Sequence, residues 1–485
     1  MLALTDPSLL REAIYLGGAW IPETTAGFIE VVNPATGVPV GRVPKATRAQ
    51  TAEAIVSAEA ALAAWSARPA NERSQIIRRW HDLIVANADD LAAILTAEQG
   101  KPFAEARGEI LYGAAFFEWY AEDAKRLYGE VLQAPSANRR MLVLRQPIGV
   151  CAAITPWNFP MAMIPRKAAP ALAAGCTMVL KPASATPFSA LALAVLAERA
   201  GVPAGVFHVL TGAASEVGDE LVMHPAVRKI TFTGSTEVGR SLMEKAAGTI
   251  KKVAMELGGN APLIVFDDAD LDVAVAGAIA SKFRNMGQTC VCANRLYVQA
   301  GIHDRFVDAL ATAVAALKVG DGMEAGTQQG PLIDAAAVEK VEEHIEDALA
   351  KGARVVAGGK RHPLGRTWFE PTVLAGVTAE MKIAREETFG PVAPVFRFET
   401  EAEAIAAANA TEFGLASYFF TRDNARVWRV SEALETGIVG VNTGATSFEG
   451  APFGGLKASG IGREGSTHGI EEFTELKYVC IAEIC

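Results

Sequence analysis

Cysteine is scarce in this chain, at six of 485 residues. A disulfide framework of the kind found in small secreted proteins is therefore excluded, because the cysteines are too few and too unevenly spaced. They are Cys151, Cys176, Cys290, Cys292, Cys480 and Cys485. The N-terminus also lacks the apolar segment of a secretory signal, because Asp6, Arg11 and Glu12 precede any long apolar stretch. We expect a protein of a reducing compartment, the cytoplasm.

Long uncharged runs are also rare. The best candidate for a membrane span is 147–165, which lies between Arg145 and Arg166. A lone helix in lipid does not tolerate several helix-breaking residues, and this stretch contains Pro147, Pro156, Pro160 and Pro165. We therefore expect a soluble protein with no membrane partner.

The chain also has no excess of positive charge. Lys and Arg number 45 against 55 Asp and Glu, which gives a net charge of −10. This balance makes nucleic acid a poor candidate partner, because the phosphate backbone requires a basic face. Half of the residues are hydrophobic and 21% are charged, so the chain has ample material for a folded core. The length predicts two to four domains, and the remaining partner class is a small molecule.

Strands and helices alternate through most of the chain. Short strands at 15–20 and 28–32 precede predicted helices at 47–65, 71–87 and 102–128. Predicted strands at 150–154, 177–180, 206–210 and 229–232 then alternate with helices at 164–174, 187–200 and 215–223. A second alternation begins at 262–266 and continues through 296–298, 304–317, 335–351 and 354–357. This pattern predicts two α/β units with largely parallel sheets.

Two segments of the first unit suit a nucleotide. Gly234-Ser-Thr-Glu-Val-Gly239 follows a strand and starts a predicted helix, whose free N–H groups attract phosphate. The motif departs from G-x-G-x-x-G, so an ordinary strand-to-helix turn is an open alternative. Lys181 ends a strand, where it would reach ribose or phosphate oxygens unless it is a solvated surface lysine.

Three residues have the chemistry of covalent catalysis. Cys290 follows Gly287-Gln-Thr, a loop suited to exposing a nucleophile beside its own backbone N–H, although most cysteines are structural. Glu256 ends an apolar strand, where burial would raise its pKa and make it a general base; a salt-bridged glutamate is the alternative. Asn158 lies between prolines and aromatics, as a rigid oxyanion donor or as an ordinary turn residue.

Taken together, these segments resemble the aldehyde dehydrogenase superfamily. The resemblance extends from Asn33-Pro-Ala-Thr-Gly37 to Pro452-Phe-Gly-Gly-Leu-Lys457. Between these ends lie Thr155-Pro-Trp-Asn-Phe-Pro160, Lys181-Pro182, Phe232-Thr-Gly-Ser-Thr-Glu-Val-Gly239, Glu256-Leu-Gly-Gly259, Gly287-Gln-Thr-Cys290 and Glu387-Thr-Phe-Gly-Pro391. Six motifs in the family's order do not arise by chance, so the alternatives for the single motifs lose most of their weight.

The resemblance implies a mechanism and a set of roles. Cys290 would attack the aldehyde, Asn158 and the Cys290 N–H would hold the oxyanion, hydride would leave to a nicotinamide, and Glu256 would activate the water that hydrolyses the thioester. The presence of Glu256 favours hydrolysis over transfer to coenzyme A. The residues expected to bind the cofactor are Thr155, Pro156, Trp157, Lys181, Ser184, Gly234, Ser235, Gly239, Leu257, Glu387 and Phe389.

Ser184 indicates the choice of cofactor. NAD-preferring members of the family commonly have a glutamate here, which would repel a 2′-phosphate. The small uncharged Ser184, close to Lys181, leaves room and positive potential for that phosphate. We expect NADP to be preferred, with NAD as a further option, and no metal.

Arginines near the nucleophile indicate the substrate. Arg166 and Arg284 suit bidentate binding of a carboxylate, unless each pairs with a neighbouring acid. The strings Ile164-Pro-Arg-Lys167, Phe283-Arg-Asn285 and Thr446-Ser447 are similar to those of succinate-semialdehyde dehydrogenases, in which two arginines and a serine bind the distal carboxylate. By this resemblance Arg166, Arg284 and, less securely, Ser447 bind the substrate. Succinate semialdehyde is the expected substrate and glutarate semialdehyde the alternative.

The resemblance also implies the domain organisation. A Rossmann-like nucleotide-binding domain would comprise 1–125 and 147–255, and an α/β catalytic domain 256–440. A small β extension, 126–146 with the C-terminal segment 441–485, would join subunits into a homodimer or homotetramer.

Cys292 lies two residues from Cys290. A strained, reducible disulfide between the two thiols is a hypothetical redox switch, and a backup thiol is the alternative role of Cys292.

Overall fold

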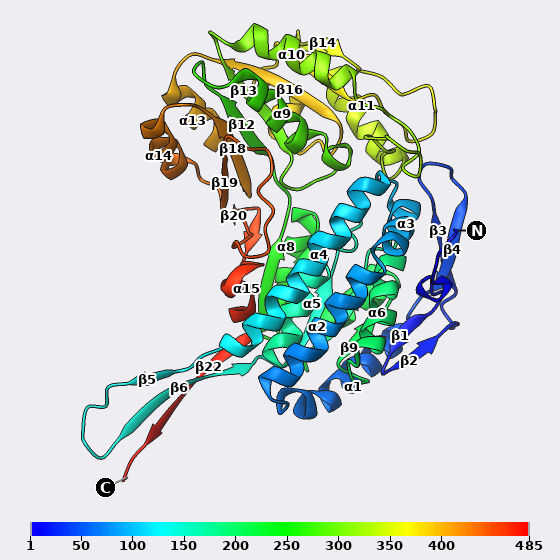
Figure 1. Ribbon diagram of the computed structural model, residues 1–485, viewed down its shortest axis with the longest axis vertical. Helices are drawn as coiled ribbons and strands as arrows, with labels where there is room; N and C mark the ends of the chain where they lie inside the picture. Colours follow the sequence, from blue (N-terminus) through cyan, green and yellow to red (C-terminus); the bar gives the residue numbers. More distant parts are fainter. Residues whose placement is uncertain (1, 484–485) are drawn as a thin grey trace.

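An eight-stranded sheet dominates the first half of the fold in the computed structural model, which describes residues 2–483 (Figure 1). In spatial order its strands are β2 (Ala19–Ile21), β1 (Ile14–Leu16), β9 (Phe207–Val209), β8 (Thr177–Lys181), β7 (Val150–Ile154), β10 (Val227–Thr233), β11 (Lys252–Glu256) and β21 (Gly460–Ile461). The five strands from β9 to β11 are parallel to one another, whereas β1, β2 and β21 pair in antiparallel fashion. The predicted β-α-β alternation of this region is confirmed.

Strand order reverses between β7 and β10, because β8 and β9 lie on one side of β7 and β10 and β11 on the other. Ligands of open parallel sheets bind beyond the carboxyl ends of the strands at such a reversal. The predicted nucleotide and oxyanion segments follow the ends of β7, β8 and β10, so the fold brings them to one edge.

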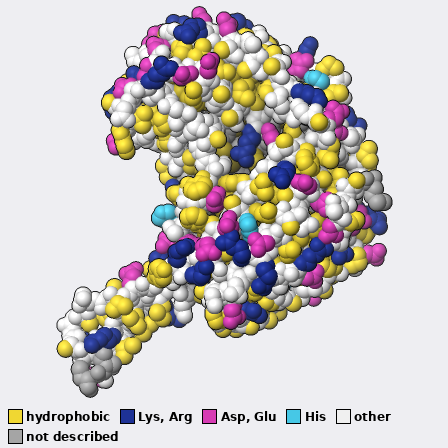
Figure 2. All heavy atoms as spheres, in the orientation of Figure 1, with side chains coloured by type: hydrophobic (Ala, Val, Ile, Leu, Met, Phe, Trp, Pro, Cys, Tyr) yellow, Lys and Arg dark blue, Asp and Glu magenta, His cyan; other side chains and the backbone are white. Residues whose placement is uncertain are grey.

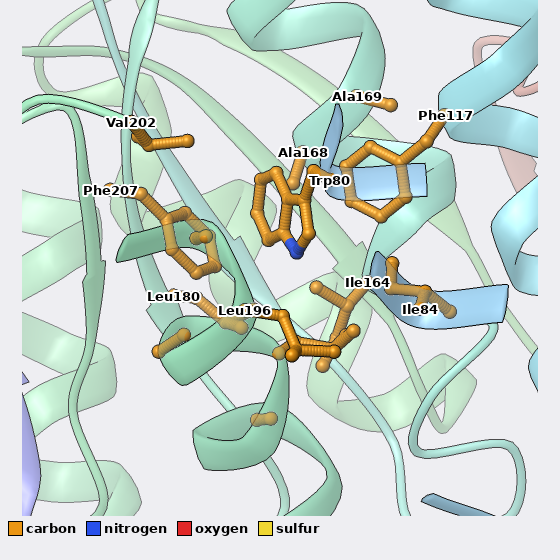
Figure 3. Packing of buried hydrophobic residues seen from close by; sticks show 14 of the residues in the cluster. Trp80, Ile84, Phe117, Ile164, Ala168, Ala169, Leu180, Leu196, Val202 and Phe207 are labelled. Carbon is orange, nitrogen blue, oxygen red and sulfur yellow. The ribbon is translucent and has the colours of Figure 1, made fainter. Parts of the chain in front are cut away.

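Helices cover both faces of this sheet. They are α1 (Arg48–Ser66), α2 (Ala70–Ala86), α3 (Ala88–Gln99), α4 (Phe103–Asp123), α5 (Pro165–Ala174), α6 (Phe188–Ala200), α7 (Asp219–Met223) and α8 (Thr236–Ala247). Figure 3 shows the centre of the core, where Trp80 of α2 packs against Phe117 of α4 and Phe207 of β9, with ring centroids 4.3 and 5.3 Å apart. Aromatic pairs at these distances stabilise the packing of helices on the sheet.

Helix α3 is not predicted by the pattern of the sequence. Nearly every residue of α3 is buried, including polar Glu98 and Gln99 at its end. A helix that is buried on all sides has no polar face and therefore no helical hydrophobic period to detect.

A seven-stranded sheet forms the second half. Its order is β14 (Arg354–Ala357), β15 (Thr372–Ala375), β16 (Val392–Phe398), β13 (Ala293–Gln299), β12 (Ala261–Val265), β18 (Ala416–Phe420) and β19 (Ile438–Val441). All neighbours are parallel except β14 and β15. The accompanying helices are α9 (Leu271–Lys282), α10 (His303–Ala315), α11 (Ala335–Ala350), α12 (Lys382–Arg385), α13 (Glu401–Asn409) and α14 (Asn424–Ala433).

A three-stranded arm extends away from both sheets (Figure 1). It consists of β5 (Glu130–Leu132), β6 (Arg140–Pro147) and the C-terminal β22 (Thr474–Ile481), which pairs with β6 along eight residues. Hydrophobic side chains are visible on the arm in Figure 2, and Val131, Leu476 and Tyr478 are more than half exposed. Exposed apolar patches of this kind mark protein interfaces.

Smaller elements complete the chain: the hairpin β3 (Phe28–Val32) and β4 (Pro39–Pro44), the pair β17 (Phe413–Gly414) and β20 (Leu456–Lys457), and α15 (Ser466–Glu471). Within residues 2–483, no helix is both long and apolar enough to cross a membrane.

Candidate active site

A cavity of about 380 Å³ lies at the carboxyl ends of β7, β10 and β11, facing the cysteine loop and the 387–389 loop. It brings together predicted residues from segments far apart in the sequence. Those that line it are Pro156, Trp157, Asn158, Gly234, Ser235, Leu257, Cys290, Glu387 and Phe389. Pockets that gather a few polar groups among apolar walls are the usual small-molecule sites.

The Asn158 side chain is held in one orientation. Its Oδ1 accepts a hydrogen bond from the Phe159 N–H at 3.1 Å, so Nδ2 is the end that donates, to the carbonyl of Gln288 at 3.0 Å. Asn158 is 5% exposed and lines the cavity with Cys290. The amide N–H groups are therefore directed to the cysteine loop, as an oxyanion donor requires.

The loop before Cys290 has an unusual backbone. Asn285 and Met286 both have positive φ, at 49° and 57°, and Gly287 follows at 72°. A Cβ at Gly287 would lie 2.2 Å from the carbonyl oxygen of Gly390, so only glycine fits there. Non-glycine residues with positive φ are held against a local cost and gather at functional sites. Desolvation raises the pKa of the Cys290 thiol to about 12, and Glu387 adds to this effect.

Glu256 is buried at the end of β11. Burial raises its pKa well above the usual range, and the negative charge of Glu464 raises it further. Its Oε2 has no hydrogen-bond partner in the part of the chain that the structure describes. Glu464 itself pairs with Lys167 and with Arg166, whose Nε is 2.8 Å from Oε2. A buried carboxyl with a free oxygen and a raised pKa has the properties of a general base.

Lys181 ends β8, outside the residues that line the cavity, and among residues 2–483 no acidic group lies within ion-pair distance of it. Lys181 is 6% exposed, its Nζ donates only to the carbonyl of Pro182 at 3.3 Å, and burial lowers its pKa to about 8. Glu387 uses Oε1 to accept from the Gly259 N–H at 3.0 Å, and burial raises its pKa to about 7. The ring of Phe389, a residue with positive φ, packs edge-on against Trp157 at 5.6 Å. These groups fit a nicotinamide dinucleotide: the lysine and glutamate would hold its ribose hydroxyls, and the ring its nicotinamide.

Four residues expected to bind the cofactor are not among those that line the cavity: Lys181, Thr155, Ser184 and Gly239. Thr155 is buried, and its backbone N–H donates to the carbonyl of Lys181. Ser184 is exposed on the turn after β8. Gly239 allows α8 to pack closely, since a Cβ there would lie 2.4 Å from the Leu257 side chain.

The two predicted substrate arginines are in different surroundings. Arg284 and Ser447 line a second, small cavity, together with Thr289 and Val291, the neighbours of Cys290 on either side. No acidic group lies within ion-pair distance of Arg284 among residues 2–483. Arg166 lines neither cavity: it is 2% exposed, packs over Phe453 at 3.8 Å and pairs with Glu464, while its Nη2 has no hydrogen-bond partner.

Cys292 is not among the residues that line the main cavity. Its thiol is 3.5 Å from the carbonyl of Lys282 at the end of α9, and the residue is 1% exposed. Burial raises its pKa. All five cysteines within residues 2–483 are free, and Cys485 lies outside the described residues.

The sequence profile of the aldehyde dehydrogenase family matches residues 20–479, nearly the entire chain. The chain belongs to this family. The predicted fold class, two α/β units with a β arm in the aldehyde dehydrogenase arrangement, is confirmed, and the protein is an oxidoreductase of the aldehyde dehydrogenase type. Enzymes of this family act on aldehydes with NAD or NADP.

Three relatives are similar over their full length. A glutarate-semialdehyde dehydrogenase of Pseudomonas aeruginosa is 62% identical, covering 100% of both chains. The succinate-semialdehyde dehydrogenase [NADP(+)] GabD of Escherichia coli is also 62% identical, covering 99% of this chain and 100% of its own. A 3-sulfolactaldehyde dehydrogenase of Pseudomonas putida is 60% identical, covering 100% of both.

Several groups of this aldehyde dehydrogenase site are not among the residues predicted from the sequence. Lys340 and Asp334 line the cavity from α11 and the turn before it, and Thr388 lies between two predicted residues. Lys167, which donates to Thr233 Oγ1 at 2.7 Å, joins the wall to Glu464. The α11 residues belong to the second sheet unit and contain no motif that signals a site, so only the tertiary fold reveals them.

Proposed function

We propose that this aldehyde dehydrogenase oxidises aldehydes that carry an anionic group at the opposite end, with succinate semialdehyde first and glutarate semialdehyde as the alternative. The observation that carries the proposal is Arg284. It is a partly buried guanidinium that forms no ion pair within residues 2–483, and it lines a cavity that begins at the neighbours of Cys290. An unpaired charge in such a place is costly unless an anion binds it.

In this proposal Cys290 is the nucleophile. Its raised pKa means that the resting thiol is neutral, so its proton must pass to water in the cavity as the sulfur attacks the carbonyl carbon. The oxygen that becomes negative accepts hydrogen bonds from the Asn158 Nδ2 and the Cys290 N–H. The bound dinucleotide supplies the hydride acceptor. Glu256 then takes a proton from water, which attacks the thioester, and the products are the carboxylic acid and the free thiol.

NADP is the proposed preferred cofactor and NAD the alternative. Ser184 is exposed on the turn that follows Lys181, so it adds no negative charge where a 2′-phosphate would bind. The Escherichia coli relative is named for NADP(+), which agrees with this proposal.

A sulfonate aldehyde is a second candidate substrate. The Pseudomonas putida relative is named for 3-sulfolactaldehyde, and a guanidinium binds a sulfonate through the same fork of N–H groups that binds a carboxylate.

We also propose the domain division predicted from the sequence and a cytoplasmic location. We propose that the arm joins subunits into homodimers or homotetramers, because its exposed Val131, Leu476 and Tyr478 suit an interface.

The test is a substrate series with purified protein. NADPH and NADH formation are followed by absorbance with succinate semialdehyde, glutarate semialdehyde, 3-sulfolactaldehyde and uncharged aldehydes of matched length. The proposal expects the highest kcat/KM for a semialdehyde with NADP. An uncharged aldehyde as the best substrate would contradict the anionic class, and a higher kcat/KM with NAD would contradict the cofactor choice.

A further inference from the structure

Lys101 and Glu109 form a buried ion pair that the proposed reaction does not use. Lys101 follows α3 and Glu109 lies on α4; each is 2% exposed, and Nζ is 2.5 Å from Glu109 Oε2. Taking two charges out of water is expensive, and apolar side chains of similar volume often stabilise a core as well or better. The presence of this pair therefore calls for an explanation other than stability.

Each end of the pair binds the backbone that carries Asn158. Lys101 Nζ donates to the carbonyl of Asn158 at 2.8 Å. Glu109 Oε1 accepts from the N–H groups of Met161 and Ala162, both at 3.0 Å. The ammonium also lies 3.9 Å from the ring centre of Phe159. The ion pair thus fixes the loop from 158 to 162 at both ends.

The contact between Lys101 and Asn158 determines more than the backbone position. The carbonyl of Asn158 and the N–H of Phe159 belong to one planar peptide group. That N–H donates to Asn158 Oδ1 at 3.1 Å, and this bond decides that Nδ2 is the end directed to the cysteine loop. Holding the peptide plane at its oxygen therefore also holds the side-chain amide.

A side chain of the cysteine loop, Asn285, also donates to the carbonyl oxygen of Asn158. Asn285 Nδ2 is 3.0 Å from the Asn158 oxygen, and Gln99 Nε2 holds Asn285 Oδ1 at 3.1 Å. On α4, Glu105 Oε2 accepts from the Asn285 N–H at 2.9 Å. The Asn158 loop and the cysteine loop are thus fixed against one helix by a connected buried network.

We propose that Lys101 is a positioning residue for the oxyanion site, orienting the Asn158 amide through the peptide group between Asn158 and Phe159. The inference rests on the proposed role of Asn158. Lys101 itself does not contact the substrate in this proposal. It affects the negative charge that develops on the oxyanion only by orienting Asn158.

The test is a double-mutant cycle of Lys101→Met and Asn158→Ala, with Lys125→Met as a control for losing an exposed lysine just after the end of α4. Aldehyde oxidation and hydrolysis of p-nitrophenyl acetate are both measured, because the ester acylates a thiol through the same oxyanion without a cofactor. Iodoacetamide alkylation of Cys290 requires the thiolate but no oxyanion donor.

Lys101→Met is expected to lower kcat at least about tenfold in both reactions while KM for NADP and the alkylation rate change less than about twofold. In the Asn158→Ala background the same substitution is expected to cost less than about twofold. An equal loss in both backgrounds, or alkylation that falls with turnover, would overturn the proposal. If the protein hydrolyses p-nitrophenyl acetate but does not oxidise the semialdehyde, the proposed substrate is wrong. The double-mutant cycle measured with the ester still tests the role of Lys101.

Lys101→Met leaves the buried Glu109 carboxylate without its ion-pair partner, and this unpaired charge can unfold the protein. The double variant Lys101→Met/Glu109→Gln is the second test for that outcome. The amide introduced by Glu109→Gln keeps an oxygen for the Met161 and Ala162 N–H groups and removes the unpaired charge. The cycle is then repeated in this background. A folded double variant that keeps the low kcat supports positioning, whereas one that regains the parent's kcat shows that only the stranded charge mattered.

Discussion

The Nδ2 of Asn158 donates to the carbonyl oxygen of Gln288 at 3.0 Å. The proposed oxyanion donor is therefore bonded to the loop of the proposed nucleophile, Cys290. Asn285 Nδ2 lies 3.3 Å from the same Gln288 oxygen. The Asn158 amide nitrogen carries two N–H groups, so one can donate to Gln288 while the other donates to the oxyanion.

Asn158→Ala should reduce kcat about 10²–10³-fold, the usual loss for one oxyanion donor. Asn158→Asp serves as the matched control for shape, since it retains the volume of the side chain and loses the amide donor. Asn158→Ala, which adds no charge beside the thiol, should retain the alkylation rate of Cys290, and steady-state kinetics with iodoacetamide titration checks this. A kcat close to the parent's in both variants would contradict the assigned role.

Glu256→Gln should separate the two halves of the reaction. Acylation of Cys290 would still release NADPH, in a burst of one equivalent per active site, but hydrolysis of the thioester would be slow because no carboxylate takes the proton from water. Stopped-flow absorbance measures the burst. A steady-state rate equal to the parent's would exclude Glu256 as the base.

The pH profile follows from the raised pKa of Glu256. Below that pKa the carboxyl is neutral and takes no proton; as pH rises through it, the carboxylate forms and deacylation accelerates. The acid limb of kcat is therefore expected well above about pH 4.3, the ordinary glutamate value. A profile that is flat from pH 5 to 8 would disagree with this assignment.

Ser184→Glu should reverse the cofactor preference. A carboxylate beside the binding position of the 2′-phosphate should raise KM for NADP at least about tenfold by charge repulsion, while KM for NAD changes little. Ala185→Glu, at the next exposed position of the same turn, is the matched control. Equal effects of the two substitutions would place the 2′-phosphate elsewhere.

Cys292 is expected to act as a redox partner of Cys290 only after a local rearrangement, because its thiol lies 3.5 Å from the Lys282 carbonyl and is buried. Peroxide inactivation of the parent should be slow and reversed by dithiothreitol, through a disulfide. In Cys292→Ala the loss should resist dithiothreitol, as over-oxidised Cys290 does. Equal recovery of both proteins would argue for a simple backup thiol.

The sequence predicted those parts of the fold and site that local patterns encode. Strands β7, β8, β10 and β11 were found because short apolar runs end in turn residues, and Asn158, Glu256 and Cys290 follow from motifs. Helix α3 and Lys340 were missed, because full burial erases a hydrophobic period and a lone lysine on α11 has no motif. The pairing of Arg166 with Glu464 joins distant segments of the chain, which only the tertiary structure shows.

The anion-binding role of Arg284 is the central claim, and Arg284→Met tests it most directly. The control is Arg305→Met, at an exposed position on α10. The measurement is kcat/KM for succinate semialdehyde and for butanal, its uncharged counterpart of equal chain length. Loss of a guanidinium that binds the distal carboxylate should lower kcat/KM for the semialdehyde about a hundredfold and leave butanal within about twofold of the parent. An equal fall for both aldehydes would contradict the account.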